Sequence, residues 1–494
     1  MSKFNSKVSP AKADSVNMAG GKAYSRDSIK EEIATVVLNT MLNGNMYYET
    51  ETDRLARIES LISQPEVAEF VAKTMVYTRT IGNLRSISHF LAGILSENVK
   101  GSDFLRSALN KSFVRPDDLT ETLSLWNARN KGKMVPNALR RAMKDSLEGF
   151  DNYQLKKYEG SRNAVKLRDV VKLAHPKGDY KALIEGRMDN IQTAQTVNAA
   201  GTEDRASNYK EMLSNRKLGY MGALKNIKNI LEAGADAETI DMLCTLLRNE
   251  RACLNSRVLP FRFIQAYEIV KGMNIDRILA KKLIKAIEDG FIISGRNVPI
   301  VDEGEKVAIL LDESGSMGPS YSRTETDSTC PFGHGKALMA SMLTGLDQEN
   351  TVGYLWADNA REVSIDGSPF DFIARTRRKG AGTNVHAALE GLIKTKTNVD
   401  KIVILTDMQM YDVDRWSKGT SQFKDIVTKY RKINPNIKIL FWNLRGYVGG
   451  TPIKLSHDIL EVSGFSDKIM SVIPKMWKDK GALIKEIETI DLAS

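Results

Sequence analysis

Three oxygen-bearing side chains follow the apolar run 307–311 in close succession. They are Asp312, Ser314 and Ser316, which form the pattern Asp-x-Ser-x-Ser at the end of a predicted buried strand. Open α/β sheets bind ligands in the crevice beyond the carboxyl ends of their parallel strands, so we expect these groups to face that crevice. Hard oxygen ligands of low total charge suit Mg²⁺, which prefers octahedral geometry and keeps part of its water shell.

Two later segments offer further ligands to the same ion. Thr383 lies in the turn 380–384, directly before a predicted helix, and Asp407 ends a second buried strand at 401–407. Asp-x-Ser-x-Ser, a threonine and a strand-terminal aspartate, in this order and spacing, resemble the metal-ion-dependent adhesion site of von Willebrand factor A domains. The resemblance implies a metal whose open position captures a carboxylate from a partner and performs no chemistry.

The elements around these residues indicate an open parallel sheet. After residue 305, apolar strands alternate with helical stretches, which is typical of a sheet with crossover helices. The predicted strands are 307–312, 351–357, 401–407, 438–444 and 458–463, and the predicted helices are 334–346, 385–397, 419–432 and 467–478. We therefore predict a Rossmann-like von Willebrand factor A domain over residues 301–494. A Rossmann-like sheet without a metal is the alternative.

Length and composition bound the class of protein. A chain of 494 residues is long enough for two or three domains. No segment approaches the roughly 20 apolar residues of a membrane helix, and the first residues lack the apolar core of a signal peptide. The three cysteines, at 244, 253 and 330, form neither a disulfide framework nor a CxxC pair. We expect a cytoplasmic protein in a reducing setting, without membrane association.

Charge is distributed unevenly along the chain. Residues 1–300 carry a net charge of +11, whereas residues 301–494 carry −1. Such an asymmetry favours a polyanionic partner for the N-terminal part, with nucleic acid as the leading candidate. A solvated, lysine-rich helical surface is the alternative.

The N-terminal part consists of successive amphipathic helices. In 136–148, for example, Ala138, Leu139, Ala142 and Met143 recur at helical spacing on one face. The predicted helices are 26–42, 54–63, 65–80, 84–98, 101–112, 117–129, 136–148, 163–174, 179–186, 207–215, 220–233, 237–250, 260–271 and 275–288. We predict an α-solenoid of antiparallel helix pairs over 25–300, preceded by a mobile tail at 1–24.

Several motifs in this order resemble the Ro autoantigen family, whose N-terminal part is called the TROVE domain. They are the segments 153–158, 165–177, 221–227 and 259–264, followed by the A-type domain. The resemblance implies a closed ring of HEAT-like helical repeats. It also implies that single-stranded 3′ ends of misfolded or unprocessed RNAs bind in the hole of the ring and that Y RNAs bind on its outer basic surface. Bacterial members of the family work with exoribonucleases.

The resemblance transfers an RNA-contact role to two residues. Lys157 matches the lysine of the family's Lys-Tyr motif, and His175 matches the histidine of its Leu-x-His-x-Lys motif. The residues themselves are compatible with this role, because Lys166 and Lys172 share a helix face and His175 precedes Pro176, where a helix must stop. An exposed ring there can contact phosphate or stack on a base, although it could simply cap its own helix. Further phosphate-contact candidates are Arg140, Arg141, Lys144, Lys225 and Arg262, with Arg216, Lys217 and Lys228.

Catalysis finds little support in the sequence. The chain contains no GxxxxGK[ST], HExxH or GxSxG motif, and its five histidines are scattered. We therefore predict a monomeric, non-enzymatic RNA-binding protein that forms a Ro-like ribonucleoprotein with non-coding RNA, in RNA quality control or processing. The first alternative is a protein-interaction scaffold whose A-type domain grips an acidic partner through Mg²⁺. The second is a metal-dependent nuclease, which lacks an evident general base.

Overall fold

The computed structural model describes residues 13–39, 49–159, 164–188, 202–298, 300, 302, 304–318, 331–346, 348–379, 382–410, 423–447, 450–463 and 472–493. Cys330, residues 1–12 of the predicted tail, and parts of the helices predicted at 419–432 and 467–478 lie outside this description.

The C-terminal domain is built on a six-stranded sheet. Its strands are β3 (Val307–Asp312), β4 (Thr351–Trp356), β5 (Ala360–Val363), β6 (Lys401–Thr406), β7 (Lys438–Asn443) and β8 (Ile459–Ser463). They are arranged in the order β5-β4-β3-β6-β7-β8, and all neighbours are parallel except the antiparallel pair β4 and β5. The order reverses beside β3, which places the end of this strand at the switch point where open sheets bind ligands.

Alternate residues of the sheet belong to two separate cores. Ile309 and Leu311 pack in a large core that also includes the helices of the N-terminal part, whereas Ala308 and Leu310 pack in a second core on the other face. The helices of this domain are α18 (Pro331–Gly345), α19 (Pro369–Arg375), α20 (Val385–Lys394), α21 (Phe423–Tyr430), α23 (Ile473–Met476) and α24 (Ala482–Glu488). Both faces of the sheet are therefore buried, as its continuous apolar strands predict.

The N-terminal part is a succession of helices, as predicted. They are α1 (Ile29–Asn39), α2 (Glu51–Ile62), α3 (Ala68–Thr80), α4 (Arg85–Asn98), α5 (Phe104–Ser112), α6 (Pro116–Arg129), α7 (Asn137–Gly149), α8 (Asn152–Glu159), α9 (Leu167–Ala174), α10 (Lys181–Glu185), α12 (Thr202–Ser214), α13 (Tyr220–Glu232), α14 (Ala237–Arg248), α15 (Glu250–Ser256), α16 (Phe261–Gly272) and α17 (Arg277–Ser294). We call α1–α10 the first arm and α12–α17 the second arm.

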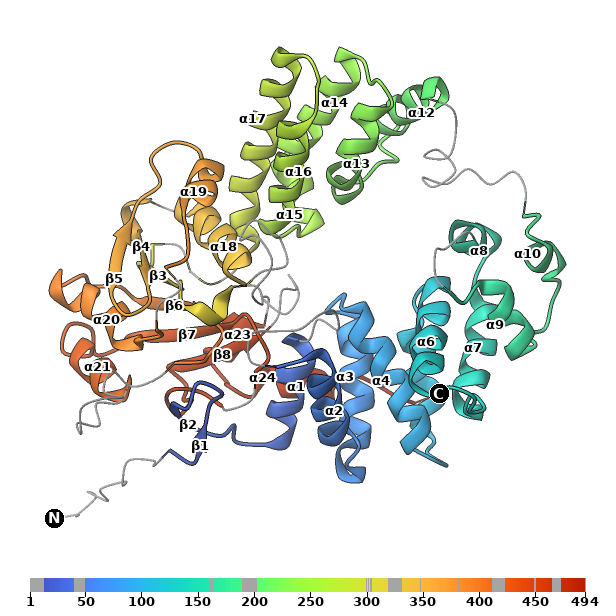
Figure 1. Ribbon diagram of the computed structural model, residues 1–494, viewed down its shortest axis with the longest axis horizontal. Helices are drawn as coiled ribbons and strands as arrows, with labels where there is room; N and C mark the ends of the chain where they lie inside the picture. The colour runs from blue at the N-terminus through green and yellow to red at the C-terminus, as the bar shows by residue number, and fades with distance from the viewer. Residues whose placement is uncertain are drawn as a thin grey trace.

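Both arms return to the C-terminal domain, so that the elements form a ring (Figure 1). In the second arm, α16 and α17 pack against α18, and Tyr267 of α16 stacks on Phe370 of α19 with ring centroids 4.3 Å apart. In the first arm, α1 packs against β8, and α3 packs against α24. Lys73 on α3 donates to the carbonyl oxygen of Glu488 at 3.1 Å. The predicted fold class, a helical-repeat ring with a Rossmann-like A-type domain, is confirmed.

The segment 13–24 differs from the expected mobile tail. It forms a short hairpin of β1 (Ser15–Val16) and β2 (Lys22–Ala23) that packs against the C-terminal domain. Asn17 donates to the carbonyl oxygen of Met410 at 2.6 Å, and the backbones of Tyr24 and Thr451 form an antiparallel bridge. The prediction was wrong for these residues because their partners lie about 400 positions further along the chain, where local composition gives no signal.

Several helix boundaries differ from the prediction, and two of them have a clear local feature. The helix expected at 237–250 ends at Arg248, because Asn249 adopts an extended conformation and its side chain accepts from the backbone N–H of Ala252, which begins α15. The helix expected at 163–174 begins only at Leu167, and Lys166 is its N-cap residue. Lys166 therefore lies before the helix, and does not share a helix face with Lys172.

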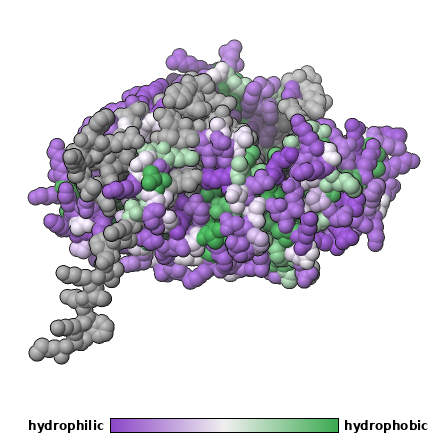
Figure 2. All heavy atoms as spheres, turned by 60° about the horizontal axis from the view of Figure 1, so that its bottom comes forward, coloured by the Kyte–Doolittle hydropathy of each residue, from purple (hydrophilic) through white to green (hydrophobic). Residues whose placement is uncertain are grey.

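The surface is mainly polar where it can be viewed. Figure 2, which brings the bottom of Figure 1 forward, shows a face on which hydrophilic side chains predominate and hydrophobic ones gather in small patches. Among the described residues, no helix combines the length and the apolar character needed to cross a bilayer.

Candidate functional site

The first group of predicted site residues lies at the carboxyl edge of the sheet. Asp312 ends β3, and its two carboxylate oxygens accept from the backbone N–H of Ser314 at 2.8 Å and the hydroxyl of Thr406 at 2.7 Å. The hydroxyl oxygens of Ser314 and Ser316 are 3.4 Å apart. Asp407 directly follows β6, the strand beside β3. The structure thus brings both carboxylates and both serine hydroxyls to one buried site at the ends of β3 and β6.

Thr383 lies at the same edge of the sheet, because its segment is hydrogen-bonded to the chain just after β4. The next residue, Asn384, donates its backbone N–H to the carbonyl oxygen of Ala357 at 2.9 Å, and Thr383 itself is buried. Two arginines hold the turn from outside. Arg378 donates to the carbonyl oxygen of Gly315 at 2.6 Å, and Arg445 donates to that of Gly318 at 3.3 Å.

The electrostatics of this turn fit a divalent cation. Burial raises the pKa of both Asp312 and Asp407, and the charge of Asp407 raises that of Asp312 further. The Oδ2 atom of Asp407 is buried and has no hydrogen-bond partner among the described residues. Two ionised carboxylates in one buried site are costly unless a cation neutralises them. No group of three or more His, Cys, Asp or Glu side chains suited to a metal occurs in the described part of the chain.

The second group consists of four basic side chains contributed by both arms. Arg85 begins α4 and Arg115 precedes α6 in the first arm, while Lys225 on α13 and Arg262 on α16 belong to the second arm. We call these four residues the basic cluster. Desolvation by the surrounding protein lowers the pKa of Lys225, and the positive charges of the other three members lower it further.

Lys225 and Arg262 are the members of the basic cluster with unneutralised charge. Both side chains are exposed, and neither has an acidic partner among the described residues. Desolvation nevertheless lowers the pKa of Arg262. Like charges that are held near one another would be stabilised by a bound polyanion.

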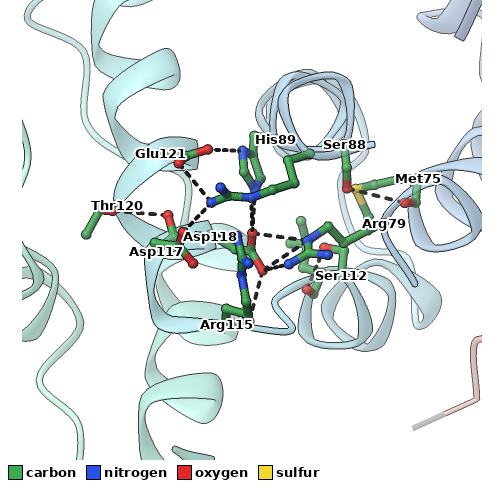
Figure 3. Close-up of polar contacts among 12 residues, drawn as sticks. Met75, Arg79, Ser88, His89, Ser112, Arg115, Asp117, Asp118, Thr120 and Glu121 are labelled. Carbon is green, nitrogen blue, oxygen red and sulfur yellow. Dashed lines mark hydrogen bonds and ion pairs between the residues drawn. The ribbon is translucent and has the colours of Figure 1, made fainter. Parts of the chain in front are cut away.

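A buried network, which Figure 3 shows around Asp118, holds Arg85 and Arg115 of the first arm. Asp118 accepts from the guanidinium of Arg79 at 2.7 Å, from Nε2 of His89 at 2.9 Å, and from the backbone N–H of Arg115 at 2.9 Å. Arg85 and Arg115 both contact Asp117, at 2.5 and 3.1 Å. The network therefore ties α3, α4 and the start of α6 together and holds Arg85 and Arg115 in place.

The pKa values of the network reflect these contacts. Burial alone would raise the pKa of Asp118, but the hydrogen bonds from His89 and Arg79 outweigh it and hold the pKa well below its usual range. Burial alone would lower the pKa of His89, but the hydrogen bonds to Asp118 and Glu121 outweigh it and raise the pKa. Ionisation of Asp118 and protonation of His89 therefore favour each other.

Most of the remaining predicted RNA-contact residues fall in two places; the exceptions are Arg216 and Lys217, which follow α12, and Lys228, which lies on α13. Lys157 on α8 lies beside Tyr158, and the guanidinium of Arg115 lies 5.5 Å from the centre of the same ring. Lys157 is therefore close to the basic cluster. The others are on α7 and α9, which pack against each other. They are Arg140, Arg141 and Lys144 on α7, and Lys166, Lys172 and His175 on or beside α9.

His175 has a distinctive backbone conformation. It is the C-cap residue of α9, with φ 51° and ψ 58° in the left-handed region, and it donates its backbone N–H to the carbonyl oxygen of Val171 at 3.0 Å. Its side chain is exposed. The left-handed backbone at this helix end thus sets the direction of the imidazole ring. The prediction of an exposed ring at a helix terminus agrees with the structure.

Sequence reasoning missed Arg85, Arg115 and the network that holds them. The available signal was the run Arg115-Pro116-Asp117-Asp118, which is a helix start with proline at the first position and acidic residues in the first turn. The pairing with Arg79, Arg85 and His89 could not be read from it, since those residues lie on other helices.

Comparison with known proteins places the chain among proteins of this architecture. The TROVE domain family model matches residues 200–288, which include Lys225 and Arg262. The rat protein "Telomerase protein component 1" is 22% identical over 347 residues, which is 52% of this chain and 13% of that protein. The mouse protein of the same name is 22% identical over 306 residues, which is 44% of this chain and 11% of that protein. The chain thus spans only a small part of either relative.

The crystal structure of the Deinococcus radiodurans Ro (RSR) protein has the same fold. It matches 91% of this chain and 100% of its own, with a TM-score of 0.58 and 15% sequence identity. The resemblance inferred from the sequence motifs is confirmed by these matches. The motifs at 153–177 lie outside the range of the family model, so the roles of Lys157 and His175 stay predictions.

Proposed function

Because the TROVE domain family model matches residues 200–288 and the chain has the fold of a Ro protein, we propose that it is an RNA-binding protein of a ribonucleoprotein. Single-stranded RNA, such as the 3′ end of a misfolded or unprocessed transcript, would bind between the two arms at the basic cluster. The observation that carries this proposal is the basic cluster, in which the positive charges of Arg262, Arg115 and Arg85 repel that of Lys225 and neither Lys225 nor Arg262 has an acidic partner among the described residues. Phosphates would relieve that repulsion, and Tyr158 offers a ring for base stacking.

The outer surface of the first arm suits a second, structured RNA. The exposed face of α7 presents Arg140 and Arg141, and α9 beside it presents Lys172 and His175. We propose that a Y-like RNA binds there, so that the two RNA classes use different surfaces. A role in RNA quality control or processing, together with an exoribonuclease, would follow from holding a 3′ end without cleaving it.

The salt dependence of binding tests the proposed function. Affinity for a single-stranded oligonucleotide should fall steeply with salt, with a log–log slope of about −0.7 for each phosphate that is neutralised. The measurement is fluorescence anisotropy with labelled oligouridylate over a salt series. An affinity that is constant from low to moderate salt contradicts the proposal.

Two substitutions test the transferred contact residues. Lys157→Ala and His175→Asn should each weaken RNA binding, by roughly 1–3 kcal/mol where a stacked ring is lost. Asparagine tolerates the left-handed conformation of position 175, so the helix end should persist. Lys156→Ala is the matched control, because Lys156 pairs with Glu159 at 2.9 Å. Normal affinity of both test variants at an unchanged melting temperature would exclude these two residues as contacts.

A protein-partner role for the A-type domain is a second candidate, which the buried oxygen of Asp407 favours. We propose that Asp312, Ser314, Ser316, Thr383 and Asp407 hold Mg²⁺. Direct ligation by hydroxyls leaves the ion short of negative charge, so an acidic group from a partner would complete its shell. The ion would supply electrostatic attraction, while the residues of the turn would orient it.

Asp312→Asn should abolish the response of thermal stability to Mg²⁺. In the unsubstituted protein, Mg²⁺ at about 100 times its Kd should add about 2.7 kcal/mol of stability. The metal-free variant should unfold no earlier than the metal-free parent, because a buried carboxylate that resists ionisation is removed. Asp366→Ala, at an exposed position after β5, is the control and should keep the Mg²⁺ response. RNA affinity should be unchanged in both, and Mg²⁺-dependent RNA cleavage lost in Asp312→Asn would instead indicate a nuclease.

A further inference from the structure

A groove of about 810 Å³ lies at the amino edge of the sheet, opposite the carboxyl edge that carries Asp312 and Asp407. Its walls come from the start of β6 and β7, from α23 and α24, and from Ile300 and Asp302 of the segment that joins the two domains. Five of its lining residues are lysines, at 401, 438, 475, 478 and 485, and one is Trp477. We call it the lysine groove.

Two lysines of the groove have unneutralised charge. Lys438 and Lys478 have no acidic partner among the described residues, and the ammonium of Lys438 lies 5.7 Å from the centre of the Trp477 ring. Lys475 and Lys485 do pair with Glu486 and Asp479, but their side chains are 63% and 69% exposed. Exposed pairs of this kind contribute little, so a phosphate can replace the carboxylate as the partner.

The groove is connected to the basic cluster through α3. Glu486, which lines the groove, accepts from the hydroxyl of Tyr77 on α3 at 3.4 Å. Two residues further along α3, Arg79 binds Asp118, which belongs to the network that holds Arg85 and Arg115. Figure 1 shows α23 and α24 between the sheet and helices α1–α3, at the junction of the first arm with the C-terminal domain.

We propose that the lysine groove is a second contact site for single-stranded RNA, on the A-type domain. A long strand held at the basic cluster would extend to the groove, where Lys438 and Lys478 contact phosphates and a base stacks on the accessible part of Trp477. Trp477 is half-buried, and lysines around an accessible aromatic face are the combination that single-strand binding surfaces use without sequence preference. An acidic peptide would use the lysines but would gain nothing from the ring. This inference rests on the proposed function.

The test compares short and long oligouridylates, over roughly 4–16 nucleotides, in anisotropy titrations of the full chain. Short oligonucleotides should bind Lys438→Gln/Lys478→Gln as they bind the parent, because they occupy only the basic cluster. Long ones should bind the variant more weakly, with the log–log salt slope reduced by about 1.4 for two lost phosphate contacts. Trp477→Leu should lose roughly 5- to 150-fold for long oligonucleotides only. Lys429→Gln/Lys432→Gln, on and after α21, is the matched control and should behave as the parent.

The outcomes separate this inference from the proposed function. Absence of RNA binding by the parent overturns both. Parental binding of long RNA with unchanged affinity in both groove variants overturns the inference alone. Binding of poly-glutamate that the lysine substitutions abolish, with RNA binding intact, would assign the groove to an acidic peptide and also overturns it. Trp477 packs partly against the core, so the lysine pair carries the test if Trp477→Leu unfolds early.

Discussion

Reversing the charge of Lys225 and Arg262 together is expected to reduce the affinity for single-stranded RNA at least about a hundredfold. Each hydrogen bond to a charged group contributes about 1.5–3 kcal/mol, and the double variant loses two such contacts and adds repulsion. The change is Lys225→Glu with Arg262→Glu, and the measurement is an anisotropy titration with oligouridylate at fixed salt. Affinity equal to that of the parent would show that the basic cluster does not bind RNA.

Two further variants make this result specific. Lys225→Gln with Arg262→Gln should also weaken binding, but its melting temperature should be unchanged or higher, since the substitution removes the repulsion that lowers the pKa of Lys225. Arg140→Glu with Arg141→Glu reverses the same amount of charge on the exposed face of α7. It should leave single-strand binding intact and weaken binding of a structured RNA. Equal losses of single-strand binding in both charge reversals would indicate a nonspecific effect of net charge.

Asp118→Asn is expected to lower the free energy of unfolding by about 3–5 kcal/mol, since removal of one partner leaves buried charges of Arg79 and His89 uncompensated. The carboxylate is fully buried, whereas the comparable pair of Arg106 and Asp145 is exposed, with side chains 56% and 26% accessible. Asp145→Asn should therefore cost only about 0–1 kcal/mol. Urea denaturation of both variants measures the difference, and equal losses would contradict the structural role of the network.

The effect of Asp118→Asn should also depend on pH. The lowered pKa of Asp118 stabilises the fold above the ordinary pKa of aspartate, and this contribution is lost as the pH falls toward the folded value. The raised pKa of His89 stabilises the fold below the ordinary pKa of histidine, and this contribution is lost as the pH rises through the folded value. The difference between parent and variant should thus be largest between about pH 4 and 6.5.

The sequence predicted the elements better than the contacts between them. The sheet could be predicted because its strands, such as 401–407, are continuous apolar runs. The placement of Asp312, Thr383 and Asp407 at its carboxyl edge could be predicted because their order along the chain and the position of the aspartates at strand ends are local signals. Strand β5 and helix α19 were not predicted, because each is short and lies between longer elements with clearer sequence patterns.

Contacts across the ring had no comparable signal. Lys225 and Arg262 were candidates only as two among many basic residues, and nothing in their neighbourhoods shows that they face Arg85 and Arg115. That arrangement depends on both arms packing against the C-terminal domain. The lysine groove is similar, since its lysines are spread over 401–485 and meet only because β6 and β7 begin at the same edge, with Lys401 and Lys438 in register.

The hairpin at 13–24 and helix α1 pack on parts of the chain that the ribosome makes last. The partners of Asn17 and Tyr24 include Met410 and Thr451, and α1 contacts β8 and α24. At about 5–20 residues per second, the first arm is complete some tens of seconds before these partners exist. During that interval the nascent chain is an open arc. Docking of the first arm on the C-terminal domain is therefore a late step, because it brings the first and last parts of the chain together only when synthesis is nearly complete.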